Sequence, residues 1–141
     1  MKFIVLVKAN AASEAGAMPS EQLMADMGRF NEELAMAGVL LAADGMHPSA
    51  RGARIRYEGE RRTVIDGPFT ESKELVAGYW IIEVGSLQEA IEWMKKAPSP
   101  AENGVGEVEI RQIFGEEDFG EAMTQSLREQ EERIRARLGA Q

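Results

Sequence analysis

Two short stretches of this chain hold the residue types that most readily carry chemistry. The first is DGMHPS, residues 44–49, which contains His47, the only histidine in the sequence. An imidazole titrates near neutral pH without special tuning, so His47 is the natural candidate for a general acid or base. A single histidine in a loop is as often a surface or structural residue, and at the level of sequence this alternative stays open.

The second stretch is DGPFTESKE, residues 66–74, which places four charged side chains, a Gly-Pro break and one phenylalanine between two apolar runs. The carboxylate of Asp66 is suited to orient an imidazole or to carry a proton itself. Asp-Gly-Pro is also ordinary turn chemistry, in which the aspartate accepts backbone N–H bonds. Turn formation accounts for residues 66–68 but not for the charged residues that follow them.

Five further residues are candidates for holding a ligand. Lys73 could bind an anionic substrate or pair with a neighbouring carboxylate, and Arg54 could stabilise a developing anion. Glu74 cannot be told apart from a solvated loop charge by composition. Phe69 and Trp80 could shape a pocket for a planar molecule, although most aromatic residues in the middle of a strand belong to the core.

Composition limits the partners and cofactors to be expected. A net charge of −8 and a pI near 4.8 disfavour nucleic acids and anionic membranes, because their phosphates would be repelled. The sequence has no cysteine, no glycine-rich phosphate loop and no cluster of metal ligands, so we expect neither a cofactor nor a metal. The N-terminal apolar run, residues 3–7, is too short for a signal peptide or a membrane span, which predicts a cytoplasmic protein.

The spacing of apolar side chains indicates the elements that must position these candidates. Residues 3–7 and 75–84 are apolar at both alternating positions, which is typical of strands covered on both faces. Leu23, Met27 and Phe30 recur at helical spacing. The expected strands are residues 1–8, 39–43, 54–57, 62–65, 75–84 and 107–114, the expected helices are residues 20–37 and 87–96, and residues 9–19 are expected to form a loop.

This order of elements predicts a ferredoxin-like α+β sandwich. Residues 1–114 form one domain, a βαββαβ arrangement with an inserted β-hairpin, and residues 115–141 form a charged C-terminal helical extension. Two helices can cover only one face of such a sheet, yet two of its strands are apolar on both faces. We therefore expect a homodimer through the sheet faces, closed like a barrel, and a possible protein partner for the thin apolar stripe of the extension.

Three stretches resemble the YCII-related, or DGPF-domain, proteins. They are GVLLAADGMHPS (residues 38–49), VIDGPFTESKELVAGYWIIEVGSLQEAIEWMKKAP (residues 64–98) and VEIRQIF (residues 108–114). The resemblance covers nearly all of residues 1–114, and the DGPFTESKE string is its most specific part.

The resemblance implies a ferredoxin-like fold that forms a dimeric α+β barrel, and a small pocket in which a histidine and an aspartate have been proposed as catalytic. Carried over to this sequence, they are His47 and Asp66, with Lys73 and Glu74 in the motif loop. It also implies a bacterial protein. Most similar proteins have no established activity, one branch is dehydrochlorinase-like and acts on chlorinated aromatic-ring products, and many are encoded beside extracytoplasmic-function sigma factors.

Two hypotheses about function follow. The first is a cofactor-independent proton-transfer or elimination enzyme, of the lyase or isomerase type, that acts on a small polar cyclic or aromatic molecule through His47 and Asp66. The second is a non-catalytic dimeric module that binds a small ligand or a protein linked to transcriptional regulation. In both hypotheses DGPFTESKE forms a wall of the site.

Overall fold

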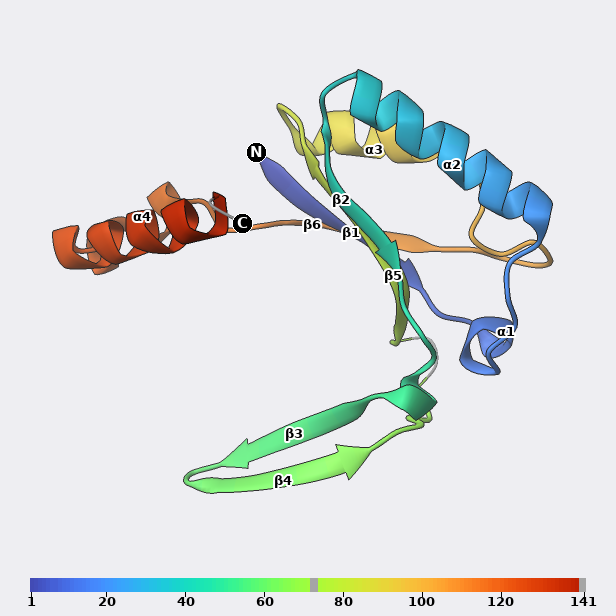
Figure 1. Ribbon diagram of the computed structural model, residues 1–141, viewed down its shortest axis with the longest axis horizontal. Helices are drawn as coiled ribbons and strands as arrows, with labels where there is room; N and C mark the ends of the chain where they lie inside the picture. Colours follow the sequence, from blue (N-terminus) through green and yellow to red (C-terminus); the bar gives the residue numbers. More distant parts are fainter. Residues whose placement is uncertain (72–73, 140–141) are drawn as a thin grey trace.

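A computed structural model describes residues 1–71 and 74–139 of the chain. The elements follow the order expected from the sequence (Figure 1). The strands are β1 (Lys2–Lys8), β2 (Leu40–Gly45), β3 (Ala53–Glu58), β4 (Arg61–Asp66), β5 (Val76–Glu83) and β6 (Val108–Gln112). The helices are α1 (Ala11–Glu14), α2 (Glu21–Met36), α3 (Leu87–Lys95) and α4 (Gln125–Gly139), with 3-10 helices η1 (Ser49–Arg51) and η2 (Glu116–Ala122).

The main sheet has four strands in the order β2-β5-β1-β6, and all neighbouring strands are antiparallel. The two long central strands, β1 and β5, are those that the sequence predicts to be apolar on both faces. Strands β3 and β4 pair only with each other, in a separate two-stranded hairpin. The α+β class and the ferredoxin-like order with an inserted hairpin are thus confirmed.

Helices α2 and α3 each begin where a serine caps them. The side chain of Ser20 accepts a hydrogen bond from the amide of Leu23, and that of Ser86 accepts one from the amide of Glu89. The carboxylate of Glu89 binds the amide of Gly85 instead of completing a capping box with Ser86. The two helices cover one face of the sheet and leave the opposite face without a helix (Figure 1).

The core lies between the sheet and these two helices. Phe30 and Leu34 of α2 and Met94 of α3 pack there against residues of β1 and β5. Trp80 meets Phe30 edge to face, with ring centroids 5.8 Å apart, and its indole N–H donates to Asn31 Oδ1 over 2.7 Å. The only polar group that this tryptophan brings into the core is therefore satisfied.

The face of the sheet away from the helices is also apolar at its centre. Phe3 and Val5 are 1% and 0% exposed on the helix side, so the alternating residues of β1 point the other way. Among these alternating residues, Ile4 pairs with Ile81 of β5 and Leu6 pairs with Tyr79. We call the four side chains the open face: Ile4, Leu6, Tyr79 and Ile81.

Two parts of the chain differ from the expectation. Residues 9–19, expected to form a loop, contain α1, because Asn10 and Ser13 exchange side-chain and backbone hydrogen bonds in a capping box. The described part of the C-terminal extension contains two helices, η2 and α4, because the backbone of Met123 leaves the helical region between them (φ −83°, ψ 85°), and Gly120, with a φ of 55°, kinks η2 internally. Within the described residues, no helix combines the length and the apolar composition needed to cross a membrane.

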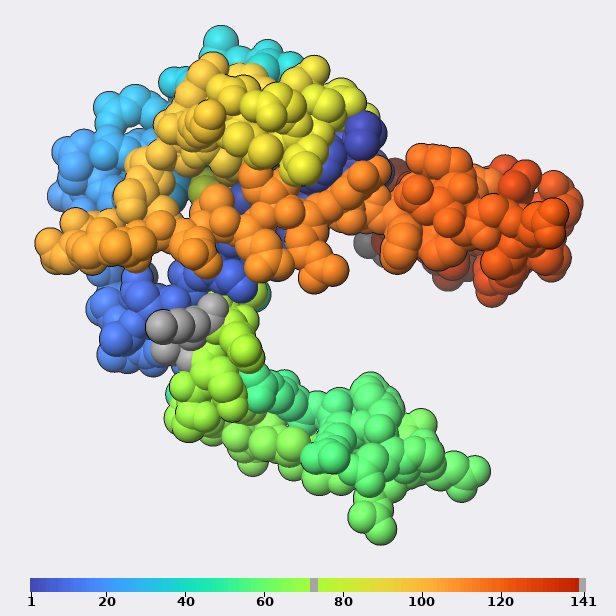
Figure 2. Space-filling model, turned by 180° about the vertical axis from the view of Figure 1, so that it is seen from behind, coloured from blue at the N-terminus to red at the C-terminus, as the bar shows by residue number. Residues whose placement is uncertain are grey.

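The hairpin of β3 and β4 projects from the body, on the side of the sheet away from α2 and α3 (Figure 1). Seen from behind, it stands apart from the sheet and from the C-terminal extension, with an open gap between them (Figure 2). Gly59, with a φ of 57°, forms the turn at its tip. We call residues 53–66 the hairpin arm.

Candidate functional site

The two stretches that carry the candidate catalytic residues lie side by side at the root of the hairpin arm. The amide of Gly67 donates to the carbonyl of Gly52 over 3.0 Å, and the amide of Phe69 donates to Ser49 Oγ over 3.0 Å. A Cβ on Gly67 would lie 1.8 Å from the carbonyl oxygen of Ser49, so only glycine permits this close approach. The loop after Asp66 is thereby fixed against η1.

Ser49 also joins both stretches to a third segment. Its hydroxyl donates to one carboxylate oxygen of Glu14 over 2.5 Å, and its amide donates to the other over 3.0 Å. Glu14 is the last residue of α1, so the segment expected to be a loop reaches the site. We call this arrangement of Glu14, Ser49 and the Phe69 amide the Ser49 junction. Neither Glu14 nor Ser49 stands out as a functional residue from the sequence alone.

His47 lies between β2 and η1, and its side chain is exposed. Arg51 Nη1 is 3.1 Å from both ring nitrogens, Nδ1 and Nε2. Because a guanidinium can only donate, the imidazole is the acceptor in this contact. His47 therefore has a cationic neighbour from its own segment.

Asp66 is the last residue of β4, opposite Ala53 in the register of the hairpin arm, and it is exposed. Within residues 1–71 and 74–139, no hydrogen bond joins its carboxylate to His47. The two segments are held together by backbone atoms and by Ser49 instead. The direct pairing of His47 with Asp66 stays a prediction.

Arg54 contacts Phe69, which is also expected to hold a ligand, and it contacts Glu71. Its guanidinium lies over the ring of Phe69, 3.8 Å from the centroid, and its Nη1 is 3.7 Å from a carboxylate oxygen of Glu71. The contact combines a cation–π interaction with a partly exposed ion pair. Lys73 lies outside the described residues. Glu74 is exposed, and its amide donates to the carbonyl of Glu71 over 2.8 Å.

Trp80 does not reach this group of residues. It is 4% exposed in the core, on the helix side of β5. The aromatic residue on the other side of that strand is Tyr79, whose hydroxyl donates to Asp44 Oδ2 over 3.1 Å. The hydrogen bond and the negative charge of Asp44 raise the pKa of Tyr79, because the carboxylate disfavours the phenolate.

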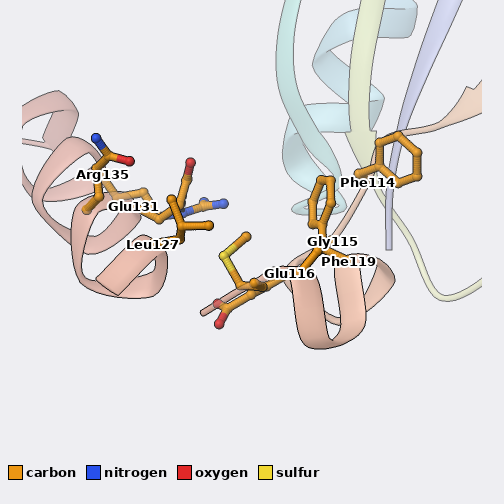
Figure 3. Close-up of a pocket in the computed structure, with 10 residues that line it drawn as sticks. Phe114, Gly115, Glu116, Phe119, Leu127, Glu131 and Arg135 are labelled. Atoms are coloured by element: carbon orange, nitrogen blue, oxygen red, sulfur yellow. Dashed lines mark ion pairs between the residues drawn. The ribbon is translucent and has the colours of Figure 1, made fainter. Parts of the chain in front are cut away.

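A cavity of about 460 Å³ opens elsewhere, in the C-terminal extension. It lies between η2 and α4, where Phe119 and Leu127 face the same space, and Glu131 and Arg135 form an ion pair at its edge (Figure 3). No candidate residue from the sequence analysis lines it. Its lining is mostly apolar, and among the described residues no group of three potential metal ligands occurs there or elsewhere.

Comparison with known proteins assigns the chain to a family. The sequence model of the YCII-related domain matches residues 1–115 of the chain. The chain belongs to the YCII-related family. An uncharacterised protein of Rhizobium meliloti strain 1021 is 30% identical over 93 residues, which are 66% of this chain and 74% of that protein. The family match ends at the start of the C-terminal extension, so all the residues that line the cavity except Phe114 and Gly115 lie outside the YCII-related domain.

Removal of the Ser49 hydroxyl should loosen the root of the arm in this YCII-related protein. In Ser49→Ala the Phe69 amide loses its acceptor and the carboxylate of Glu14 loses a donor. Loss of a hydrogen bond to a charged group costs about 1.5–3 kcal/mol, so we expect exchange of the Phe69 amide to quicken at least about tenfold. Hydrogen exchange followed by NMR measures it, and Ser99→Ala, which removes a hydroxyl bonded only to its own loop, is the matched control. Equal protection of Phe69 in both variants would contradict the junction.

The Tyr79 contact gives a second prediction, at alkaline pH. The pKa of Tyr79 is raised in the folded protein. The hydrogen bond to Asp44 therefore stabilises the fold fully at pH values below the pKa of an unfolded tyrosine. This stabilisation is lost as the pH rises through the raised pKa of the folded protein. Asp44→Asn should lower the pKa of Tyr79. The chain has two tyrosines, so phenolate absorbance in a Tyr57→Phe background reports Tyr79 alone. The same midpoint with and without Asp44 would exclude the contact.

Proposed function

We propose that this protein is a cofactor-independent proton-transfer or elimination enzyme for a small polar cyclic or aromatic molecule, with its site at the root of the hairpin arm. The observation that supports this proposal is the pair of hydrogen bonds that hold residues 66–69 against residues 49–52. These bonds keep the segments of Asp66 and His47 in a fixed relation. A fixed relation between two proton carriers is what acid–base catalysis requires.

In the proposed elimination, Asp66 or His47 removes a proton from the carbon next to the one that carries the leaving group. The electrons of the broken C–H bond form a carbon–carbon double bond, and the leaving group departs with its own bonding pair. For a chlorinated ring the products are chloride and an unsaturated ring, with the proton on the base. Arg54, which contacts Phe69 in the loop after Asp66, is the cation that would stabilise negative charge as it develops.

Dimerisation through the open face is part of the proposal. Ile4, Leu6, Tyr79 and Ile81 lie at the centre of a sheet face that has no helix over it (Figure 1). The corresponding face of a second copy is the simplest apolar surface to cover it, and a twofold axis makes the contact self-complementary. We place this homodimer in the cytoplasm.

The second candidate is a non-catalytic binding module. It is favoured by the C-terminal extension, in which Leu127, Ile134 and Leu138 are 43%, 47% and 64% exposed on α4. Such a stripe is suited to a groove of a protein partner, and a regulator of transcription fits the gene neighbourhood implied by the resemblance. Under this hypothesis Asp66 has only a structural role in its loop.

Chloride release separates the two candidates. The wild-type protein should release chloride from at least one member of a panel of chlorinated cyclic compounds, and Asp66→Asn and His47→Gln should each lower kcat by about a hundredfold or more. An ion-selective electrode measures the release. Glu60→Gln, in the turn of the arm, is the matched control and should keep full activity. A folded Asp66→Asn variant with wild-type turnover would remove Asp66 from the mechanism, and a wild-type protein inactive on the whole panel would favour the binding module.

The dimer is tested separately by placing a charge on the open face. Ile81→Lys puts an ammonium group at the centre of the proposed interface, where it has no partner, and should convert the dimer to a monomer at micromolar concentration. Sedimentation velocity measures the change, and Ile65→Lys on the hairpin arm, outside the open face, is the control for a lysine at an exposed isoleucine. A dimer that survives Ile81→Lys unchanged would show that the open face is not its interface.

A further inference from the structure

The cavity between η2 and α4 has the size and the lining of a small-molecule site. Its volume of about 460 Å³ lies within the range of roughly 300–1,000 Å³ that such sites occupy. Phe114, Phe119 and Leu127 line it, and their side chains are 73%, 45% and 43% exposed. The chain therefore leaves three large apolar side chains of this cavity in contact with water, which a bound molecule would displace.

The walls of the cavity are joined to the sheet and to each other. The amide of Ile113 donates to the carbonyl of Lys2 over 2.8 Å, so the chain that enters the η2 wall is attached to β1. Only residues 123–124 separate η2 from α4, and Arg128 Nε of α4 is 2.9 Å from a carboxylate oxygen of Glu116 in η2. The cavity is thus formed before any ligand enters, which lowers the entropic cost of binding.

The η2 side of the cavity presents a pair of aromatic rings. The centroids of Phe114 and Phe119 are 5.1 Å apart, with 45° between the ring planes. Leu127 lies on the α4 side (Figure 3), and the thioether of Met123 also lines the cavity. Phenylalanine rings interact favourably with a further ring in offset or edge-to-face geometry, and a thioether makes favourable contacts with ring edges. This lining favours a planar aromatic molecule over an aliphatic one.

The charged groups at the cavity neutralise one another. Glu116 pairs with Arg128, and Glu131 pairs with Arg135, whose Nε is 4.0 Å from the carboxylate. A charged ligand would lose hydration on entering without gaining an unpaired counter-charge from these four residues. Gln130 also lines the cavity, and its amide can both donate and accept a hydrogen bond. The lining therefore suits a neutral molecule that carries a polar group.

We propose that this cavity binds a neutral aromatic molecule of one or two rings that bears a hydroxyl group or a similar polar substituent. The ring packs between the phenylalanine pair and Leu127, and the substituent forms a hydrogen bond with Gln130. None of the residues proposed to carry the reaction lines the cavity, and the extension stands apart from the hairpin arm (Figure 2). The site is therefore separate from the proposed active site, and it does not depend on the proposed reaction.

Binding of 2-naphthol, a neutral two-ring probe, tests the proposal. The methionine methyl groups of the full chain are isotopically labelled, and their NMR signals are followed as the probe is added. The Met123 signal, identified by its absence in Met123→Leu, should shift and reach saturation. The signal of Met18, which is 83% exposed and does not line the cavity, should not move. The anion 2-naphthoate, of similar shape, should bind at least about tenfold more weakly, because it finds no unpaired counter-charge.

Two identical truncations on α4 separate the cavity from the rest of the helix. Leu127→Ala removes part of the lining and should weaken the binding of 2-naphthol at least about fivefold, because apolar contact with the ring is lost. Leu138→Ala removes the same atoms at a position that does not line the cavity, and should bind the probe as the wild type does. Both leucines are exposed, so both variants should stay folded.

Four results would contradict the proposal. A Met123 signal that does not shift up to the solubility of the probe would exclude the site. Equal affinity of Leu127→Ala and Leu138→Ala for the probe would place its binding outside the cavity. Equal affinity of the wild type for 2-naphthoate would overturn the neutral class of ligand. A Met123 signal that shifts with protein concentration before any probe is added would show that another protein chain fills the cavity instead.

Discussion

The fold is governed by a mismatch between one apolar sheet and the helices available to cover it. Residues that alternate along β1 are apolar on both faces, yet α2 and α3 pack on one face only, where Phe3 and Val5 are almost fully buried. The opposite face keeps Leu6 and Ile81 at its centre. Exposed apolar area of this kind is costly in water, and burying it against a copy of itself requires no additional element.

A second constraint is local and polar. Three segments far apart in sequence meet at Ser49, whose hydroxyl binds a carboxylate oxygen of Glu14 and accepts the amide of Phe69. A hydroxyl can donate once and still accept, so one side chain satisfies a charged group and a backbone N–H together. Gly67 lets the chains approach closely enough for this to happen. The root of the arm is thus ordered by hydrogen bonds, with little apolar packing.

Sequence predicted the elements whose causes are local, and not the contacts made between distant segments. The α2 helix was predictable to within a residue at each end, because Ser20 and the apolar stripe act within a few positions. The short α1 helix was not, since it has a capping box but no apolar stripe. Ser49 and Glu14 are 35 residues apart, and no spacing rule joins them. The alternation of residues along β5 predicts that Trp80 lies on one face of the sheet, but not which face is buried. That face is the core because α2 packs on it and Asn31 of α2 accepts the indole N–H.

The exposure of the candidate site in a single chain bears on what chemistry it can perform. Asp66 and His47 both lie in solvent, where water screens charge and weakens any interaction with a developing anion. Electrostatic catalysis is effective where water is excluded and the donors are fixed in advance. The Ser49 junction supplies the fixed geometry within one subunit, but not the exclusion of water. If the protein is an enzyme, a second surface must therefore close the site.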